Sequence, residues 1–552
     1  MVAGPPVGRF PPGPALVRQT RGSAVINGER IGYAALRLKR MSAQEAAALI
    51  PSGANVGMSG FTGAGYPKAV PLALAERMKG LRDSGEPFRI NVWTGASTAP
   101  ELDGALAEAE GIELRLPYQS DPVSRAKINA GLMEYIDVHL SHVAQMAWEG
   151  FLGPLTLAIV EVSAITPDGH LIPSSSVGNN KTWIDQADQV ILEVNAWQSE
   201  HLDGMHDIYY GTRLPPHRQP IPLVEAGDRI GSPYFTCPAD KIVAVVETEA
   251  PDRNTAFDPP TAVSTAIAGH LIDFLTHEVG RGRLPDNLLP LQSGVGNVAN
   301  AVLAGLAEAP FTQMSAYTEV IQDGMLELLR RGKLTVASAT AFSLSPTALD
   351  TLNAELPTLR DRIVLRPQEI SNHPELIRRL GVLAMNGMIE ADLYGNVNST
   401  HLMGTRIQNG IGGSGDFARN AYLSMFLSPS TAKDGNISCI VPMVSHVDHT
   451  EHDVALIVTE QGLADLRGLS PKRRARLIID RCAHPDFRPA LQDYHERAQA
   501  SGRGAHTPHL LEEALSWHTD YLRTATMRPT PTPASAADPH SGPAFRPADP
   551  ES

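Results

Sequence analysis

Short apolar runs separated by helical patterns constrain the fold of this chain more than any other feature of its sequence. The runs are rich in valine, isoleucine and leucine. Such runs are typical of strands that are buried on both faces, as in a parallel sheet. They lie at residues 157–162, 190–194, 241–247 and 454–459, and helical patterns lie at 68–80, 299–308 and 319–332. The alternation of strands with helices predicts an α/β fold with mainly parallel sheets.

The length of the chain predicts more than one domain. Its 552 residues exceed what a single core normally holds, so we expect two domains of ordinary size. A polar stretch with prolines follows the strand at 241–247 and marks a boundary near residue 250. We therefore predict an N-terminal domain over 21–250 and a C-terminal domain over 251–527. The proline-rich ends, 1–20 and 528–552, are predicted to be disordered.

The two halves also resemble each other in the order of their features. In the first half, Glu161 is followed by a turn and a glycine-bearing loop at 176–180. In the second half, Glu390 is followed by a turn and the glycine-rich loop 409–415. This order predicts two similar open α/β domains that face one another, with the active site between them. Chance similarity is the alternative, because any α/β chain of this length contains such elements.

The composition argues against several classes of binding partner and site. The formal net charge of −14 argues against nucleic acid, because phosphate binding needs clustered lysine and arginine. The three cysteines lie far apart, so we predict neither a disulfide framework nor a zinc site, and a cytoplasmic location is the simplest interpretation. No apolar run approaches the roughly 20 residues of a membrane span, and the N-terminus lacks a secretory signal. His446, His449 and His452 are interpreted as hydrogen-bonded side chains, and no metal is predicted.

Glu319 is the first candidate for chemistry. It lies between apolar neighbours where a strand is expected to give way to a helix. The carboxyl ends of strands are where open α/β sheets bind ligands, and a desolvated carboxylate there can attack a thioester carbonyl. The alternative is a helix-capping acid beside Thr318, which the local sequence alone favours.

Two glycine-rich segments are candidates for backbone-lined sites. The segment from Gly294 to Gly296 would point backbone N–H groups at an anion, although the local sequence alone favours a plain structural turn. It lacks the third glycine of the dinucleotide fingerprint, so a nicotinamide or flavin site is not supported. The loop 409–415, with a helix starting near Asp416, suits donors that stabilise an oxyanion; a flexible surface loop is its alternative. Glu460 ends the strand at 454–459, before another expected helix, and either orients Glu319 or a substrate or serves as a structural cap.

Several long segments together resemble the acetyl-CoA hydrolase/transferase family, and within it the class I succinyl-CoA:acetate CoA-transferases. The similarity runs from about residue 25 to 527, with the segments in the order typical of the family. The most specific segments are GVGNVANAV from 294, YTEVIQDG from 317, RPQEISNHPE from 366, YGNVNSTH from 394, NGIGGSGDFARNAYLS from 409, PMVSHVDHTEHDV from 442 and TEQGLADLRGLSP from 459.

The resemblance implies a role for each of these positions. Glu319 matches the nucleophilic glutamate, and Asn372 matches a residue that contacts the thioester carbonyl. Backbone N–H groups of Val295 and Gly413 would form an oxyanion hole. Ser97 and Glu460 match positions behind the site of the small carboxylate. The positions that match coenzyme A contacts are Gly294, Val295, Gly296, Asn297, Val298, Ile389, Asn409, Gly413, Lys433 and, with a looser match, Arg253.

The function implied is transfer of coenzyme A from succinyl-CoA to acetate through a covalent intermediate on Glu319. Coenzyme A would be a substrate, and no tightly bound cofactor is expected. An acetyl-CoA hydrolase and a propionyl-CoA:succinate transferase share every motif and stay open as alternatives. A catalytically silent coenzyme A-binding module and a dinucleotide-dependent dehydrogenase fit the motifs less well. A homodimer is the expectation from the family.

Overall fold

The computed structural model describes residues 29–528 except 98, 254–257 and 503. The N-terminal extension and nearly all of the proline-rich tail therefore lie outside the described residues. By its contacts the chain divides into two compact units. The first runs to residue 387 and also includes 406–427, and the second comprises 388–405 and the chain from 428 onward.

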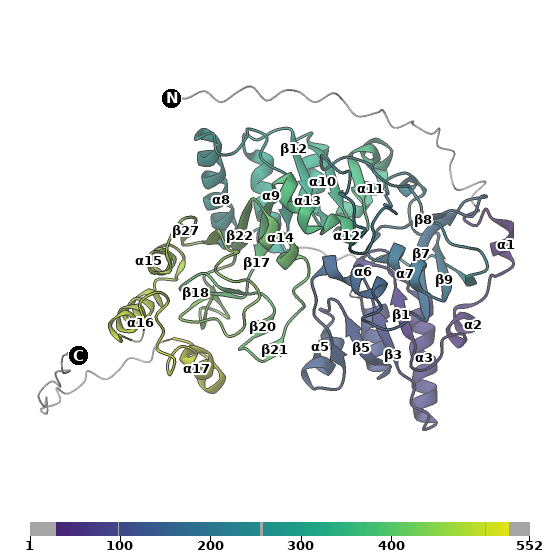
Figure 1. Cartoon of the computed structure of the whole chain (residues 1–552), viewed down its shortest axis with the longest axis horizontal. Helices are drawn as coiled ribbons and strands as arrows, with labels where there is room; N and C mark the ends of the chain where they lie inside the picture. Colours follow the sequence, from purple (N-terminus) through teal and green to yellow (C-terminus); the bar gives the residue numbers. More distant parts are fainter. Residues whose placement is uncertain (1–28, 98, 254–257, 503, 529–552) are drawn as a thin grey trace, which may run out of the picture. The chain divides into compact units, whose positions relative to one another are not determined.

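The first unit contains a mainly parallel sheet built from the N-terminal half (Figure 1). Its main strands follow the order β10-β9-β7-β1-β3-β5-β6, and the short strand β8 (Leu171–Pro173) adds an antiparallel pair to β7. Every residue of β7 is buried, as expected for an inner strand. The bounds are β1 Asn55–Met58, β3 Ile90–Trp93, β5 Ile112–Leu116, β6 Glu134–Tyr135, β7 Leu157–Ile165, β9 Gln189–Asn195 and β10 Ile242–Thr248. The predicted strands at 157–162, 190–194 and 241–247 are confirmed as β7, β9 and β10.

The same unit contains a second parallel sheet built from later residues. Within this unit its order is β16-β14-β12-β11-β17-β22, with parallel pairing throughout. Counted along the chain, this arrangement repeats that of β6-β5-β3-β1-β7-β9 in the first sheet. The bounds are β11 Leu291–Ser293, β12 Met314–Tyr317, β14 Leu334–Ala339, β16 Ile363–Leu365, β17 Leu383–Gly387 and β22 Leu423–Leu427. The predicted α/β fold with mainly parallel sheets is confirmed.

Helices connect the strands and cover the sheets. Apolar side chains of α2 and α3 join a core with residues of the first sheet, such as Val56 and Ile90. Residues of α12, α13 and α14 form another core with Tyr317 of β12. The bounds are α2 Ala43–Ala48, α3 Ala69–Asp83, α5 Pro122–Asn129, α6 Leu140–Trp148, α7 Asn180–Gln186, α8 Ala262–Gly280, α9 Asn297–Glu308, α10 Asp323–Arg330, α11 Pro346–Leu359, α12 Gln368–Ser371, α13 Pro374–Leu380 and α14 Ser414–Asn420. The helices predicted at 68–80 and 299–308 are confirmed as α3 and α9.

The second unit has a small sheet and three longer helices. Strand β18 (Glu390–Asp392) lies between β19 (Val397–Asn398) and β25 (Ile440–Val441). Strands β26 (Leu456–Thr459) and β27 (Gly462–Asp465) pair antiparallel, and α15 (Pro471–Cys482), α16 (Arg488–Ala500) and α17 (Ser516–Thr524) follow. Among the helices of the described ranges, none combines the length and apolar character needed to cross a bilayer.

The helix predicted at 319–332 is confirmed only from Asp323 onward, and the helix predicted after Glu460 is wrong. The pattern at 319–332 begins with strand β13 (Val320–Gln322), which pairs with β15 (Ala341–Ser343), and the helix α10 starts only at Asp323. The β-branched pair at 320 and 321 is buried in that pairing, so tertiary contact overrides the helical pattern. After Glu460 the chain enters β27 rather than a helix. Gly462, at φ +152°, closes the hairpin close to the Arg481 carbonyl.

The predicted domain boundary near 250 stays a prediction. The first parallel sheet ends with β10 at Thr248 and the second begins with β11 at Leu291. The two compact units divide the chain at different positions, because residues of both parallel sheets belong to the first unit.

Candidate active site

Glu319 lies at the carboxyl edge of the second parallel sheet, just after β12. Its carbonyl oxygen accepts hydrogen bonds from the N–H groups of Thr340 (2.8 Å) and Ala341 (3.2 Å), which follow the neighbouring strand β14. The residue is thus fixed between two strand ends. The next helix starts four residues later, so Glu319 is not the helix-capping acid that the local sequence favours.

Asn372 and Gly413, both predicted site residues, are brought against the Glu319 carboxylate. The Asn372 side chain follows α12 and donates from Nδ2 to Glu319 Oε1 at 3.1 Å. A Cβ atom at position 413 would lie 2.0 Å from Glu319 Oε1, so only glycine allows this close approach of backbone and carboxylate. The three residues come from separate loops of the second sheet and form one cluster.

The surroundings of Glu319 make its carboxylate unusually basic. Desolvation raises its pKa to about 7, the Asn372 hydrogen bond opposes this rise, and the negative charge of Asp416 adds to it. The side chain still keeps a partly exposed surface. A basic and partly accessible carboxylate is suited to attack an electrophilic carbonyl.

Asp416 is a part of this cluster that sequence reasoning missed, except as the start of a helix. It lies on α14 with its side chain buried, and desolvation raises its pKa to about 7. Its carboxylate accepts hydrogen bonds from the N–H (3.0 Å) and the hydroxyl (2.6 Å) of Ser141. Ser141 is 275 residues earlier in the chain, on α6 of the N-terminal half. No local motif signals a contact over that separation.

Tyr118 is a second contribution from the N-terminal half. Its ring lies beside the glycine-rich loop, since a Cβ atom at Gly410 would be 3.1 Å from Cδ2 of the ring. It packs against an apolar cluster that contains Val320, the residue after Glu319. Burial raises the pKa of Tyr118 to about 12; a hydrogen bond with Ser120 opposes this rise and the charge of Glu319 adds to it. Residues from both halves of the chain therefore contribute to the surroundings of Glu319.

The predicted glycine turn lies where the strand order of the second sheet reverses direction. Gly294 follows β11, which is flanked by β12 on one side and β17 on the other, and ligands bind at such switch points. Gln322 on β13 donates from Nε2 to the carbonyl oxygens of Ser293 (3.2 Å) and Gly294 (2.8 Å). The turn is thus connected to Glu319 through β13. Gly296, at φ +143°, leads into α9.

The remaining residues of this predicted anion site lie at the surface of the loop and the start of α9. The Val295 side chain is 54% exposed. Asn297 is exposed and donates to the Asp258 carboxylate at 2.9 Å, and Val298 is partly exposed. Asn409 belongs to the other glycine loop and donates from its side chain to the Gly410 carbonyl at 2.9 Å.

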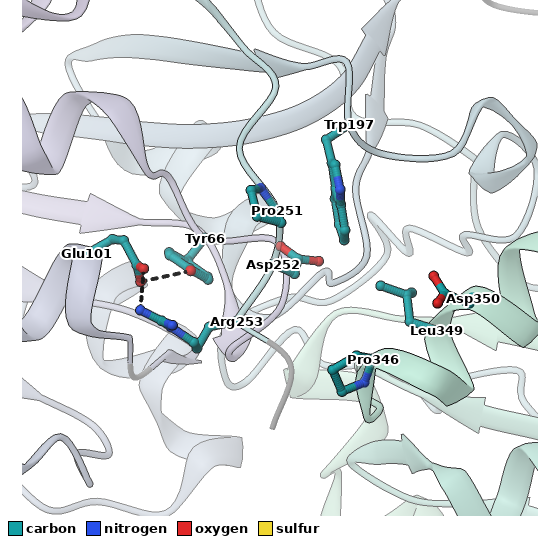
Figure 2. A pocket seen from close by; sticks show the side chains of 9 residues that line it. All are labelled: Tyr66, Glu101, Trp197, Pro251, Asp252, Arg253, Pro346, Leu349 and Asp350. Carbon is teal, nitrogen blue, oxygen red and sulfur yellow. Dashed lines mark hydrogen bonds and ion pairs between the residues drawn. The ribbon is translucent and has the colours of Figure 1, made fainter. Parts of the chain in front are cut away.

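Arg253 lines a different pocket, of about 270 Å³ (Figure 2). Its guanidinium contacts Glu101 at 2.6 Å, and the Tyr66 hydroxyl donates to the same carboxylate at 3.1 Å. Trp197 forms another part of the lining, and neither Glu319 nor Gly413 is among the lining residues. The structure therefore does not bring Arg253 together with Glu319.

Three predicted residues lie in the second unit. Ile389 is partly exposed, and its N–H donates to the Asn398 carbonyl at 2.9 Å. Lys433 is exposed in the turn between β23 (Thr431–Ala432) and β24 (Ile437–Ser438), with φ at +51°. Burial would raise the pKa of Glu460, but hydrogen bonds from Ser430 and Gln461 outweigh burial and lower it.

The two remaining predictions concern Ser97 and the three histidines at 446, 449 and 452. Ser97 is part of strand β4 (Ala96–Ser97), but its side chain falls outside what the structure describes. Over the described ranges, no three histidine, cysteine, aspartate or glutamate side chains gather as metal ligands. His449 lies within hydrogen-bond distance of the Ser399 hydroxyl, at 3.4 Å.

Comparison with known proteins finds two matching family models. The acetyl-CoA hydrolase/transferase N-terminal domain matches residues 29–247, and the C-terminal domain of the same family matches residues 351–495.

Several proteins are similar to this chain over most of its length. A succinyl-CoA:acetate CoA-transferase from Clostridium kluyveri is 52% identical over 91% of this chain and 92% of its own length. A propanoyl-CoA:succinate CoA transferase from Escherichia coli is 46% identical over 88% of this chain and 98% of its own. An acetyl-CoA hydrolase from Schizosaccharomyces pombe is 45% identical over 87% and 95%.

Solved structures share the fold. RipA from Yersinia pestis superimposes with a TM-score of 0.66 at 25% identity, covering 84% of this chain and 98% of its own. A 4-hydroxybutyrate CoA-transferase from Porphyromonas gingivalis gives a TM-score of 0.57 at 22% identity, with the same coverage of both chains.

Proposed function

Because the chain belongs to the acetyl-CoA hydrolase/transferase family, we propose that it transfers coenzyme A from succinyl-CoA to acetate, with Glu319 as the nucleophile. The protein is an enzyme of this family. The single observation that supports the role of Glu319 best is its desolvated carboxylate, held 3.1 Å from the Asn372 amide and against the backbone of Gly413.

The proposed reaction has two exchanges on the same carboxylate. A Glu319 oxygen attacks the thioester carbonyl of succinyl-CoA, the C–S bond breaks, and coenzyme A leaves as a thiolate while a mixed anhydride forms. The thiolate then attacks the glutamyl carbonyl and displaces succinate, which leaves a glutamyl-CoA thioester. Acetate repeats these steps in reverse and leaves as acetyl-CoA. Each intermediate is an anhydride or a thioester and conserves the free energy of the starting thioester, so no nucleotide hydrolysis is required.

The surrounding groups are proposed to stabilise the oxyanions of these steps. Asn372 Nδ2 already donates to Glu319 Oε1, and the same N–H can donate to a thioester carbonyl bound beside it. Backbone N–H groups of Gly413 and Val295 are the other proposed donors. Gly413 is the better supported of the two, because its backbone approaches the carboxylate directly.

Coenzyme A is proposed to bind along the glycine turn from Gly294 to Val298. The position of that turn at the reversal of strand order supports this proposal. Lys433, Ile389 and Asn409 are proposed as further contacts, and Lys433 offers an exposed cation for an anionic cofactor. Arg253 is a weaker proposal because it is already paired with Glu101. Ser97 and Glu460 are proposed to act behind the small carboxylate.

Acetyl-CoA hydrolysis is the second candidate function. It would follow if water, rather than acetate, attacked the glutamyl-CoA thioester. The partly exposed surface of Glu319 allows this chemistry. Relatives named acetyl-CoA hydrolases are 41–45% identical, and the Escherichia coli relative named for propanoyl-CoA and succinate is 46% identical. The 52% identity of the succinyl-CoA:acetate relative favours the first proposal.

We further propose a cytoplasmic homodimer in which coenzyme A is a substrate and no other cofactor is held. The free cysteines Cys237, Cys439 and Cys482 fit a reducing compartment. The proposed domains meet near residue 250, and the catalytic carboxylate belongs to the C-terminal one.

A donor–acceptor panel tests the proposed function. Wild type, Glu319→Ala and the surface control Glu76→Gln are given each acyl-CoA with and without each carboxylate. Wild type should release acetyl-CoA only when acetate is added, and mass spectrometry should detect coenzyme A on the peptide that contains Glu319. The alanine variant should lose exchange and adduct, whereas the control keeps both. Thioester loss without any carboxylate would instead establish the hydrolase, and full exchange by Glu319→Ala would exclude the mechanism.

A further inference from the structure

The Asn372 amide lies between two carboxylates. Its Nδ2 donates to Glu319 Oε1 at 3.1 Å and lies 3.4 Å from Asp416 Oδ2. The hydroxyl of Ser371 donates to Asn372 Oδ1 at 2.8 Å, which fixes the amide's orientation. One N–H of the amide is therefore directed at the reacting carboxylate and the other at Asp416.

Asp416 is anchored from the opposite side by α6. Its Oδ1 accepts from the Ser141 hydroxyl at 2.6 Å, and its Oδ2 accepts from the Ser141 N–H at 3.0 Å. The carbonyl of Leu140, the preceding residue, accepts a hydrogen bond at 2.9 Å from Gln368, the first residue of α12. The start of α6 thus contacts both the helix that precedes Asn372 and the helix that follows Gly413.

A carboxylate at position 416 can accept from all three of its neighbours. Each of the three groups directed at Asp416 is a donor: the Ser141 hydroxyl, the Ser141 N–H and the Asn372 amide. Alanine removes all three acceptor contacts, whereas asparagine could keep them by turning its N–H₂ toward the Ser141 hydroxyl, which can accept as well as donate. The side chain is 3% exposed, so water does not replace a lost partner easily.

We propose that Asp416 is a positioning residue for the transfer reaction, which holds the Asn372 amide and the Gly413 backbone at fixed places around Glu319 through its bonds to Ser141. This inference rests on the proposed function. During the reaction the Glu319 oxygens change from carboxylate to anhydride to thioester, and the bond between Asn372 and Glu319 changes with them. The bond to Asp416 does not, so the amide stays in position to donate to the oxygen that develops charge.

A double-mutant cycle with Asn372 tests the proposal. Asp416→Ala is prepared in the wild-type and in the Asn372→Ala background, and kcat and KM are measured with succinyl-CoA and acetate. In the wild-type background we expect kcat to fall about 10- to 100-fold, the effect of one or two misplaced hydrogen bonds, with KM for succinyl-CoA changing less than about threefold. In the Asn372→Ala background the same substitution should lower kcat less than about threefold, because its partner is already gone.

A second anchor of the glycine loop provides the matched control. Asp137 also lies in the N-terminal half and accepts at 2.9 Å from the N–H of Ile411, without contacting Asn372. Any effect of Asp137→Ala should be the same in both backgrounds. Ser141→Ala is the milder variant: it keeps the Asp416 charge and should give a smaller loss with the same non-additivity.

The outcomes separate the two proposals. Wild-type exchange and an adduct on Glu319 must be present first, and their absence refutes the proposed function itself. With both present, equal losses from Asp416→Ala in the two backgrounds, or a loss expressed only in KM, would overturn the role of Asp416. Thermal unfolding is measured for every variant, and if Asp416→Ala does not fold, the Ser141→Ala cycle decides by the same criterion.

Discussion

Replacing Glu319 by glutamine is expected to stabilise the protein at neutral and alkaline pH while abolishing transfer. The carboxylate has a pKa near 7 in the folded protein against its usual 4.5, because the site desolvates it. Folding therefore favours the protonated form, and this contribution to stability is fully present below pH 4.5 and is lost as the pH rises through 7. Glutamine has nearly the same shape, stays neutral, and its oxygen can still accept the bond from Asn372.

The size of the effect follows from the two pKa values. A shift from 4.5 to about 7 gives a destabilisation by the ionised carboxylate of about 3 kcal/mol at pH 8, about 2 kcal/mol at pH 6 and below about 1 kcal/mol at pH 5. The larger compact unit spans roughly 400 residues, for which about 3 kcal/mol corresponds to a rise in Tm of about 3 to 4 °C.

Differential scanning calorimetry of wild type and Glu319→Gln at pH 5, 6 and 8 measures this difference. The gain in Tm should grow with pH, and adduct formation should be absent at every pH. Glu76→Gln, an exposed change on α3, controls for the loss of one charge. A Tm difference that is constant across the pH range, or lower in the glutamine variant at pH 8, would refute the claim that desolvation dominates the site.

Three further predictions concern the ionisation of Glu319, a second buried carboxylate and a buried ion pair. Since the nucleophile must be ionised, kcat/KM of the wild type should fall roughly tenfold per pH unit below about pH 7, which a pH–rate profile checks. Glu369→Gln removes another buried carboxylate whose pKa desolvation raises to about 7, so it should also raise Tm at pH 8, but unlike Glu319→Gln it should keep transfer activity in the same assay. Arg366→Ala leaves Asp207 as a buried unpaired charge and should lower the free energy of unfolding by about 3–5 kcal/mol in denaturant titrations.

Much of the fold can be predicted because inner strands carry a local signal. The runs that become β7, β9, β10 and β26 are mostly apolar, with buried glutamates at 161 and 193 among the exceptions, and burial on both faces favours that composition. The helix predicted from Glu319 onward starts later than predicted for a related reason. Residues 320 and 321 are apolar in either conformation, and only their pairing with residues 341 and 342 of β15 makes them a strand.

Some residues of the candidate site can likewise be recognised from the local sequence, and others cannot. Gly413 and the loop around it can be recognised from four glycines within six residues, which allow bare backbone to approach a ligand. Glu319 looks like an ordinary capping acid in its local sequence, and its importance came from resemblance to a family. Asp416 and Tyr118 have no local signal, since their partners belong to distant segments.

By itself, the sequence determines which segments are buried strands, where glycine permits a close approach, and that the chain belongs among coenzyme A-handling enzymes. Only the tertiary structure decides that Ser141 and Asp416 meet beside Asn372, and that Glu319 becomes basic there. The physical reason is that burial and hydrogen bonding between segments 275 residues apart depend on how the two sheets pack, which no local pattern of residues encodes.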